Sequence, residues 1–547
     1  MSVIPVIRRS DSSAALAIVV ALWTTDARAL GEVEHLGTVD FSVSCSEAVK
    51  QEFDHAVALL HHMTYPRAKA AFEQVAKLDP ECAMAQWGIA MSLFQPLWPT
   101  RPGPEQLQQG WDAVQKARAL APPTERERLY IASAEAFFRA PESTEYWERI
   151  RRWEKAMEAL HRRFPADPDA ATLYALAHLA AAPPGEGARE HHARAAEILM
   201  SVYADNPDHP GSIHYTIHAN DTRGRERESL DVVRSYAKIA PRNPHALHMP
   251  THIFTRIGDW NGVIELNLQA AETALEHSAG EDGQYVWDEF PHAVEYLVYA
   301  YLQQGADDEA ERQLERLRST ARLQPTFKTA FHLASVPARY ALERRAWQEA
   351  AALAPRPYDA LDWERFPWPE AVTWFARGLG AAHVGRPEEV ERALERLGEL
   401  EQAADRAGEE LFTRQIRILR LGVSAWLAHV QGDEDRALEQ MRAAAELELA
   451  TPKHPVTPAP TLPADELLGD LLVERGKPEQ ALAAYQRSLE LHPNRLNSLL
   501  GAARAARDLG DAEMARGFYA AMAQMAVAHS DRAGLKEISN LMKAAAH

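Results

Sequence analysis

The chain has 547 residues, of which 46% are hydrophobic and 25% are charged, and its formal net charge at pH 7 is −19. At roughly 100–200 residues per domain, this length predicts several domains or one long array of repeats, and the apolar content excludes a chain that is disordered throughout. The acidic balance argues against a protein that binds duplex nucleic acid, because such proteins present a basic face to the phosphates. We therefore expect no nucleic-acid partner.

The first 29 residues have the pattern of an export signal. Arg8 and Arg9 are followed by the apolar stretch 14–23 and by the tripeptide 27–29, Ala-Arg-Ala, which matches an A-x-A cleavage site. The apolar stretch is shorter than the roughly 20 residues that a membrane-spanning helix needs, and no later run contains 18 consecutive apolar residues. An ordinary first helix is the alternative interpretation. The pattern predicts a periplasmic or secreted protein whose mature chain has no membrane span.

The chain has two cysteines, Cys45 and Cys82, and both follow the predicted cleavage site. Cys45 precedes one predicted helix and Cys82 begins the helix of the next repeat, so both lie at the same end of neighbouring helices. An even number of cysteines in an exported protein favours one disulfide bond between them. Two buried free thiols are the alternative, because unpaired cysteines are common in protein cores.

A helix-turn-helix unit recurs along the chain with the 34-residue period of the tetratricopeptide repeat, abbreviated TPR. The clearest copy covers residues 462–495, in which Gly476 lies in the turn and Pro493 closes the unit. The small residues Gly469 and Ala481 allow its two helices to approach closely. Further copies are marked by similar residues near positions 68–88, 297–310, 374–390, 421–437 and 499–519. These repeats predict an all-α fold, a right-handed TPR-like superhelical solenoid of about a dozen helix pairs.

Changes in composition predict how the chain is organised. The expected parts are a signal peptide (1–29), N-terminal TPR-like repeats (30–180), central His-rich TPR repeats (181–320), further TPR-like repeats (321–449), a Pro- and Thr-rich linker (450–463) and C-terminal TPR repeats (464–547). The central part differs from the others in histidine content, because 11 of the 23 histidines lie between His178 and His292. We therefore expect the functional site in the central repeats.

Two adjacent central repeats carry histidines at equivalent positions. One begins at Pro210 with PGSIHYTIHAND, and the next begins 34 residues later with PHALHMPTHIFTR. His214 and His218 in the first repeat therefore correspond to His248 and His252 in the second. Each pair is spaced i, i+4, which places two imidazoles one turn apart on the same face of a helix. In a TPR frame these positions face the concave groove.

Pro250 lies between the two histidines of the second repeat. In a helix interior it would kink the axis, whereas a helix that begins near Leu247 would hold Pro250 in its first turn. The residues alone leave both alternatives open.

The repeat that follows adds His292 and Glu295 to the same predicted surface. Imidazole and carboxylate groups together suit transition metals such as Zn, Cu or Fe, and no cysteine lies nearby to favour a softer site. We therefore predict a metal site formed by His214, His218, His248, His252, His292 and Glu295. These ligands exceed the needs of one ion, so the pattern fits either two ions or one ion surrounded by additional histidines. A groove that binds an acidic or aromatic peptide without a metal is the alternative.

Several phrases of the sequence resemble those of exported bacterial TPR proteins. They are VSCSEAVKQEFDHAVALLHHMTYPRAKAAF, LDPECAMAQWGIAMSLFQPLW, DHPGSIHYTIHAND, APRNPHALHMPTHIFTRIGDW and DEFPHAVEYLVYAYLQ, and the resemblance covers roughly residues 38–305. It implies the TPR fold and the same residue types at Cys45, Cys82, His61, His214, His218, Asp221, His248, His252, Arg256, Asp288 and His292. In this family Glu295 more often corresponds to aspartate, and Gln95 stands where a histidine is common. The family has no settled activity, so the resemblance implies a site but no reaction.

The residues thus favour an extracytoplasmic TPR solenoid that binds a transition metal in its concave groove. A bound metal would activate water or oxygen or polarise a carbonyl, as in a hydrolase or oxidase with a small-molecule substrate. Glu295, Asp288 or Asp221 would then be the general base, and Arg256 would hold an anionic group of the substrate. The alternative function is a non-catalytic scaffold that binds a peptide or protein partner in the cell envelope.

Overall fold

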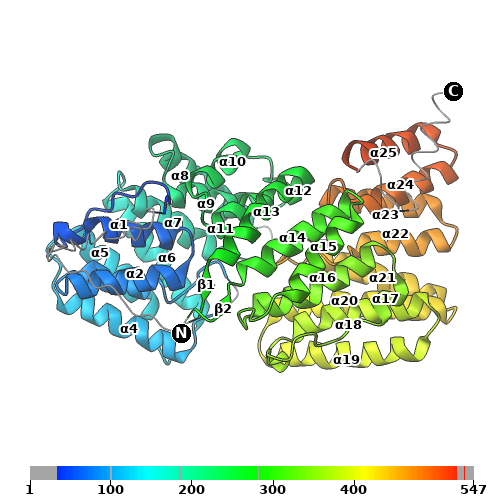
Figure 1. The fold of residues 1–547 in the computed structure, drawn as a ribbon, viewed down its shortest axis with the longest axis horizontal. Coiled ribbons are helices and arrows are strands. Elements are labelled where there is room, and N and C mark those ends of the chain that lie inside the picture. Colours follow the sequence, from blue (N-terminus) through cyan, green and yellow to red (C-terminus); the bar gives the residue numbers. More distant parts are fainter. Residues whose placement is uncertain are drawn as a thin grey trace, which may run out of the picture. The chain divides into compact units, whose positions relative to one another are not determined.

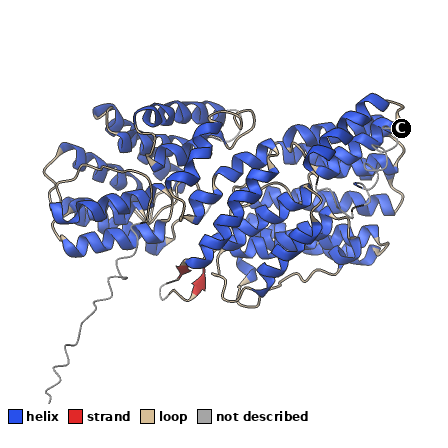
Figure 2. Cartoon of the chain, turned by 45° about the horizontal axis from the view of Figure 1, so that its top comes forward, coloured by secondary structure: helices blue, strands red, loops and turns tan. Residues whose placement is uncertain are grey.

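Helices make up most of the described chain, and one short two-stranded sheet lies among them (Figure 2). The computed structural model describes residues 34–98, 101–183, 187–280, 283–526, 532 and 535. The predicted export signal, residues 1–29, lies outside the described residues. Residues 35–547 form one unit, and within its described residues no helix is both long and apolar enough to cross a lipid bilayer.

The elements follow one another with short connections. The first are η1 (Glu47–Val49), α1 (Lys50–His61), α2 (Tyr65–Leu78), α3 (Ala83–Met91), α4 (Pro104–Ala119), α5 (Glu125–Phe138), α6 (Tyr146–Arg163), α7 (Pro168–Ala180), α8 (Gly187–Asp205), α9 (Pro210–Asn220), α10 (Leu230–Ile239), α11 (Pro244–His248), α12 (Pro250–Ile257) and α13 (Trp260–Glu276). The chain continues through β1 (Ser278–Ala279), β2 (Tyr285–Val286), α14 (Glu289–Gln303), α15 (Asp307–Ser319), α16 (Phe327–Glu343), α17 (Trp347–Ala351), η2 (Trp363–Arg365), α18 (Pro367–His383), α19 (Pro387–Arg406), α20 (Glu410–Val430), α21 (Glu434–Leu449), α22 (Ala464–Glu474), α23 (Pro478–Leu491), α24 (Leu496–Asp508) and α25 (Ala512–Met525).

Most helices pack mainly on helices one or two places away in the chain. Examples are α18 on α19, α20 on α21 and α24 on α25, which lie side by side in Figure 1. Strands β1 and β2 pair with each other in an antiparallel hairpin between α13 and α14. Packing between nearest neighbours is the defining property of a repeat array. The structure therefore confirms the predicted all-α superhelical repeat fold.

The predicted repeat at residues 462–495 shows why small residues recur in this fold. Helices α22 and α23 are joined by a turn in which Gly476 has a φ of +63°, a backbone conformation that favours glycine. The ring of Tyr485 on α23 lies directly over Gly469 on α22, because a Cβ atom at Gly469 would be 2.6 Å from that ring. Glycine at this position is therefore required for the close approach of the two helices.

The proline between His248 and His252 breaks the helix in two. Helix α11 ends at His248, and Pro250 is the first residue of α12, where its missing N–H group costs no hydrogen bond. The side-chain hydroxyl of Thr251 donates to the carbonyl oxygen of His248 at 2.6 Å. The structure thus has a helix that begins at Pro244, stops and restarts, so the two histidines belong to different helical segments.

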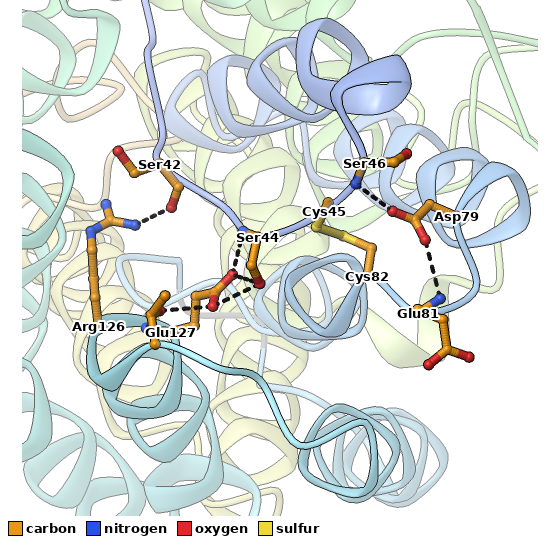
Figure 3. The surroundings of a disulfide bond; sticks show 10 residues. Ser42, Ser44, Cys45, Ser46, Asp79, Glu81, Cys82, Arg126 and Glu127 are labelled. Carbon is orange, nitrogen blue, oxygen red and sulfur yellow. Dashed lines mark hydrogen bonds between the residues drawn. A yellow bond between two sulfur atoms is a disulfide. The ribbon is translucent and has the colours of Figure 1, made fainter.

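A disulfide bond joins Cys45 and Cys82, as predicted, with their Cα atoms 4.7 Å apart (Figure 3). Cys82 immediately precedes α3. The residues beside Cys45 add hydrogen bonds, because the Ser44 amide donates to a carboxylate oxygen of Glu127 at 2.7 Å. The disulfide and these bonds attach the N-terminal extended segment to α3 and α5.

The Pro- and Thr-rich segment 450–463, which we call the strap, connects α21 to α22 without forming a helix. Three of its apolar side chains are buried: Val456 is 2%, Ala459 1% and Leu462 2% exposed. His454 in the strap packs against the rings of Phe327 and Trp368. The strap is therefore part of the packed interior, and two of its polar side chains reach the central repeats described below.

Gly88 offers a test of the close packing between helices. A Cβ atom at Gly88 on α3 would lie 2.3 Å from the ring of Phe72 on α2, whereas a Cβ atom at Gly398 on α19 would meet nothing within 4 Å. We expect Gly88→Ala to lower the free energy of unfolding by about 1–3 kcal/mol through overpacking. Gly398→Ala, the matched control, should raise it by about 0.5–1 kcal/mol, because alanine is the better helix former. Chemical denaturation measures both, and equal stability of the two variants would contradict the packing described here.

Candidate metal centre

Seven histidine side chains from α9, α11, α12, α14 and α16 lie close together in the central repeats. We call them the central histidine cluster: His214, His218, His245, His248, His252, His292 and His332. All are buried except His218, which is half-buried. This differs from the open concave groove that the sequence predicted. His332 on α16 contacts His292, and the strap contacts Glu295 and Asp221, the two carboxylates that bond to histidines of the cluster.

Three of the predicted ligands form the tightest group. His248, His252 and His292 each place one ring nitrogen within 4.8 Å of the corresponding nitrogens of the other two. The Nε2 atoms of His248 and His252 are 3.0 Å apart, and the ring centroids of His248 and His292 are 4.2 Å apart. In a tetrahedral zinc site with Zn–N bonds of 2.0–2.1 Å, two ligand nitrogens are about 3.3 Å apart. The three side chains are therefore close to the spacing of a metal site.

The hydrogen-bond partners of His248 determine which of its nitrogens is free. The side-chain amide of Asn267 donates through Nδ2 to the carbonyl oxygen of Val263 at 2.8 Å, so Oδ1 is its acceptor atom. This oxygen lies 2.7 Å from Nδ1 of His248. Nδ1 of His248 must therefore carry the hydrogen, and Nε2 of the neutral ring carries the lone pair.

The same reasoning applies to His252. Its Nδ1 atom lies 3.2 Å from a carboxylate oxygen of Asp221, which accepts the Nδ1 hydrogen. The unprotonated Nε2 atoms of His248 and His252 consequently face each other at 3.0 Å. Two lone pairs at this distance repel each other, and a metal ion or a shared proton between them would remove the repulsion.

His292 is oriented through a longer chain of hydrogen bonds. Its Nδ1 atom lies 3.0 Å from Nε2 of His332, whose Nδ1 lies 2.6 Å from a carboxylate oxygen of Glu295. A carboxylate can only accept a hydrogen bond, so Nδ1 of His332 donates to Glu295. Nε2 of the neutral His332 ring is then the acceptor for the hydrogen on Nδ1 of His292. The second oxygen of Glu295 accepts from Arg339 at 3.1 Å. Glu295 therefore orients His292 through His332, and the Nε2 atom of His292 is left for a ligand.

Burial keeps these rings neutral. It lowers the pKa values of His248 and His292 well below their ordinary range, and the neighbouring histidines lower them further. Burial also lowers the pKa of His252, although Asp221 opposes this effect. A neutral imidazole is the form that binds a metal ion. At neutral pH the three ligands thus need no deprotonation before an ion binds.

The other two predicted histidine ligands form a separate group. Nε2 of His214 lies 3.2 Å from Nε2 of His218 and 3.3 Å from Nε2 of His245. Nδ1 of His214 donates to the carbonyl oxygen of His61 at 2.7 Å. The six predicted ligands are therefore not equivalent, since His214 and His218 lie together and Glu295 lies behind His332.

The predicted general bases and the predicted anion-binding residue are engaged in ion pairs. Arg256 donates through Nε to a carboxylate oxygen of Asp221 and through Nη2 to its backbone carbonyl oxygen at 2.8 Å. Lys453 of the strap lies 3.5 Å from the other carboxylate oxygen of Asp221. Asp288 lies 3.2 Å from the amino group of Lys328. These side chains are thus held by one another, and each carboxylate among them has a cationic partner.

Sequence reasoning missed three residues of this region. His245 follows Pro244 near the start of its helix, as His292 follows Pro291, and this repeated Pro-His pair is a signal that could have identified it. His332 and Asn267 have no such signal. They reach the cluster from α16 and α13, which lack the paired histidines.

A second buried group has hydrogen bonds to all of its ring nitrogens; it consists of His61, Asp169 and His209. Both imidazoles contact the same carboxylate oxygen of Asp169, at 2.9 Å from His61 and 3.3 Å from His209. The other nitrogen of His61 lies 3.2 Å from the hydroxyl of Tyr215, and that of His209 accepts from the Ser212 amide. Every ring nitrogen has a partner, so this group fastens α1, α7 and α9 together. His61 therefore has a structural role here.

Comparisons with known proteins identify neither a family nor a function. No family model matches the chain, and no curated protein matches its sequence. Among solved structures, it is similar to a monomeric mutant of IFIT1 with m7Gppp-AAAA, at 12% sequence identity and a TM-score of 0.34, over 81% of this chain and 90% of that chain. We draw no inference about ligands from so distant a likeness.

His62 tests the energetic effect of burying neutral histidines beside the cluster. Its Nδ1 atom lies 2.8 Å from the hydroxyl of Tyr236 and its Nε2 atom 3.1 Å from the carbonyl oxygen of Leu36, and burial lowers its pKa to about 3. Below about pH 6.5 the unfolded chain binds a proton at His62 and the folded protein does not, so acidification lowers the free energy of unfolding by about 1.4 kcal/mol per pH unit. Urea unfolding of metal-free protein should show that His62→Gln removes about 2 kcal/mol of the loss between pH 7 and pH 5.

The control is His55→Gln, at a half-buried position on the same helix. It should keep the pH dependence of the unaltered protein. An unchanged slope in His62→Gln would show that His62 does not stay neutral in the folded protein.

Proposed function

We propose that this protein is an extracytoplasmic helical-repeat protein that binds a transition-metal ion through the Nε2 atoms of His248, His252 and His292. One observation carries the proposal: three neutral imidazoles converge, and a hydrogen bond at Nδ1 fixes the tautomer of each. Metal-binding histidines characteristically have such partners on their second nitrogen, because these bonds orient the ring and raise its basicity. The disulfide between Cys45 and Cys82 is compatible with an oxidising compartment.

The chemistry of the ligands favours Zn, Cu or Fe. Imidazole nitrogens suit these ions, whereas Mg and Ca prefer oxygen ligands. Both cysteines of the chain are in the disulfide bond, so thiolate is not among the ligands. Three histidines leave at least one coordination position of a tetrahedral zinc ion for water or a substrate.

A metal with an open position would also support catalysis, as a hydrolase or an oxidase. It would lower the pKa of a bound water or polarise a carbonyl group. The ring of Tyr296 packs edge-on against His248, with their centroids 4.5 Å apart, and forms one wall of the site. The carboxylates of Asp221 and Glu295 orient His252 and, through His332, His292. Their contribution to a reaction would therefore be to hold the ligands.

The burial of the cluster argues against the alternative scaffold function at this site. A peptide in an open groove would contact exposed side chains, but His248 is 1% and His252 3% exposed. Metal binding therefore explains the buried histidines better than peptide binding does.

Elemental analysis of untagged protein tests the metal site directly. We expect at least one equivalent of a transition metal per chain and a loss of one equivalent in His248→Ala and in His252→Ala. The control His55→Ala removes a half-buried histidine on α1, outside this group, and should keep the full metal content. Less than a tenth of an equivalent in the unaltered protein, with no uptake on titration, would refute the proposal.

Asn267 tests whether the hydrogen bond that orients His248 matters for metal binding. Asn267→Leu removes the acceptor of the His248 Nδ1 hydrogen, and we expect it to weaken metal binding by about 10–100-fold. Asn267→Asp keeps an acceptor oxygen at this position and should retain most of the affinity. Competition with a coloured chelator measures both dissociation constants. Equal affinities in the two variants would mean that Asn267 does not orient His248.

A further inference from the structure

Tyr296 on α14 lies against all three proposed metal ligands. It follows His292 by four residues, about one turn of the helix, and its side chain is fully buried. The centroid of its ring lies 4.5 Å from that of His248, 5.3 Å from that of His252 and 5.4 Å from that of His292. The phenol is therefore part of the immediate surroundings of the metal centre.

The hydroxyl group of Tyr296 is directed at His252. Its oxygen lies 3.4 Å from Nδ1 and 3.5 Å from Nε2 of that ring, and within the described part of the chain these are its hydrogen-bonding contacts. Both distances exceed the roughly 2.7–3.2 Å of ordinary hydrogen bonds between nitrogen and oxygen. Because the oxygen is almost equally far from the two nitrogens, it lies off the axis of the Nε2 lone pair. The hydroxyl is thus beside the space for an ion and not at a ligand position.

The hydrogen of this hydroxyl lacks a good acceptor. Nδ1 of His252 carries the hydrogen that Asp221 accepts, so it has no lone pair to offer. Nε2 of His252 has a lone pair, but an ion bound there would use it. Buried polar groups normally have a hydrogen-bond partner. With an ion in place, the Tyr296 hydroxyl would have none among its contacts in the described residues, and an acceptor atom held by the ion would provide one.

Charge balance indicates what kind of ligand this would be. The three proposed ligands are neutral imidazoles, so they leave the positive charge of an ion uncompensated. The carboxylates that orient them have cationic partners, since Asp221 pairs with Arg256 and Lys453, and Glu295 pairs with Arg339. An uncompensated charge in a buried site is costly. An anion bound to the ion would reduce that charge, whereas a neutral molecule would not.

We propose that the open coordination position of the metal binds a small anion and that the hydroxyl of Tyr296 donates a hydrogen bond to it. This inference rests on the proposed function, since it names the class of ligand that the metal takes and the residue that recognises it. The anion is small because the site is enclosed: Tyr296 is 0%, His292 2% and His252 3% exposed. Tyr296 thereby favours anions whose coordinating atom can also accept a hydrogen bond.

Azide titration of the cobalt-loaded, full-length protein tests this assignment. Azide is a small anion, and its coordinating nitrogen keeps a lone pair. The visible absorption of Co²⁺ should change on azide addition and saturate. Tyr296→Phe retains the ring and removes only the hydroxyl, so it should keep the cobalt content. We expect it to weaken azide binding by about 3–10-fold, the effect of one lost hydrogen bond.

The matched control is Tyr299→Phe on the same helix. The hydroxyl of Tyr299 contacts the guanidinium of Arg495 at 3.4 Å, and its ring packs against Trp260. Arg495 retains its bonds to Glu343 and Glu466 when this hydroxyl is removed. This variant should therefore keep both the cobalt content and the azide affinity of the unaltered protein.

Each result has a distinct meaning. The absence of cobalt uptake by the unaltered protein would refute the proposed function and this inference with it. Cobalt uptake without any response to azide would overturn the anion site and leave the metal site intact. Equal azide dissociation constants in the unaltered protein and Tyr296→Phe would overturn the role of the hydroxyl. Loss of cobalt from Tyr296→Phe would make Tyr296 a direct ligand and would overturn the hydrogen-bonding role as well.

Discussion

A buried imidazole is stable only when its N–H group has an acceptor, and this requirement organises the central repeats. The acceptors for the Nδ1 hydrogens come from separate elements: Asn267 on α13, Asp221 after α9, His332 on α16 and the carbonyl group of His61 on α1. Each of these bonds selects one tautomer. As a result, the Nε2 lone pairs of neighbouring histidines face one another, which is the arrangement that a metal ion stabilises. The candidate site is therefore produced by packing between repeats and not by any one helix.

The buried guanidinium group of Arg339 extends this organisation to the strap. A buried charge requires several partners, and Arg339 bonds to Glu295 at 3.1 Å, to the Thr457 hydroxyl at 3.2 Å and to the Ala459 carbonyl oxygen at 2.8 Å. Glu295 in turn orients His332 and, through it, His292. Since Lys453 of the strap also contacts Asp221, both carboxylates that orient the first histidine group touch the strap. The strap thus contributes to the geometry of the site although it provides no ligand.

Much of the fold and part of the site follow from local features of the chain. The repeat period predicts the helix pairs, because the apolar and small residues that pack two helices together recur at fixed spacing. The i, i+4 pairs that begin at His214 and His248 predict ligands on two neighbouring helices, because the two pairs lie one repeat apart. The pairing of Cys45 with Cys82 was also predictable, since each cysteine lies at the same end of adjacent helices. These properties depend on sequence separations within one or two repeats.

The sequence by itself determined the all-α repeat architecture and placed histidines at equivalent positions of adjacent repeats, because both depend on helical periodicity. Only the tertiary structure decided how those histidines are divided into two groups, that they are buried, and that Glu295 lies behind His332 and not among the ligands closest to one another. The contributions of His332, Asn267 and the strap arise from contacts across tens to hundreds of residues, for example between Glu295 and Thr457. No local pattern encodes such contacts, since they depend on how successive repeats stack and on which buried polar groups need partners.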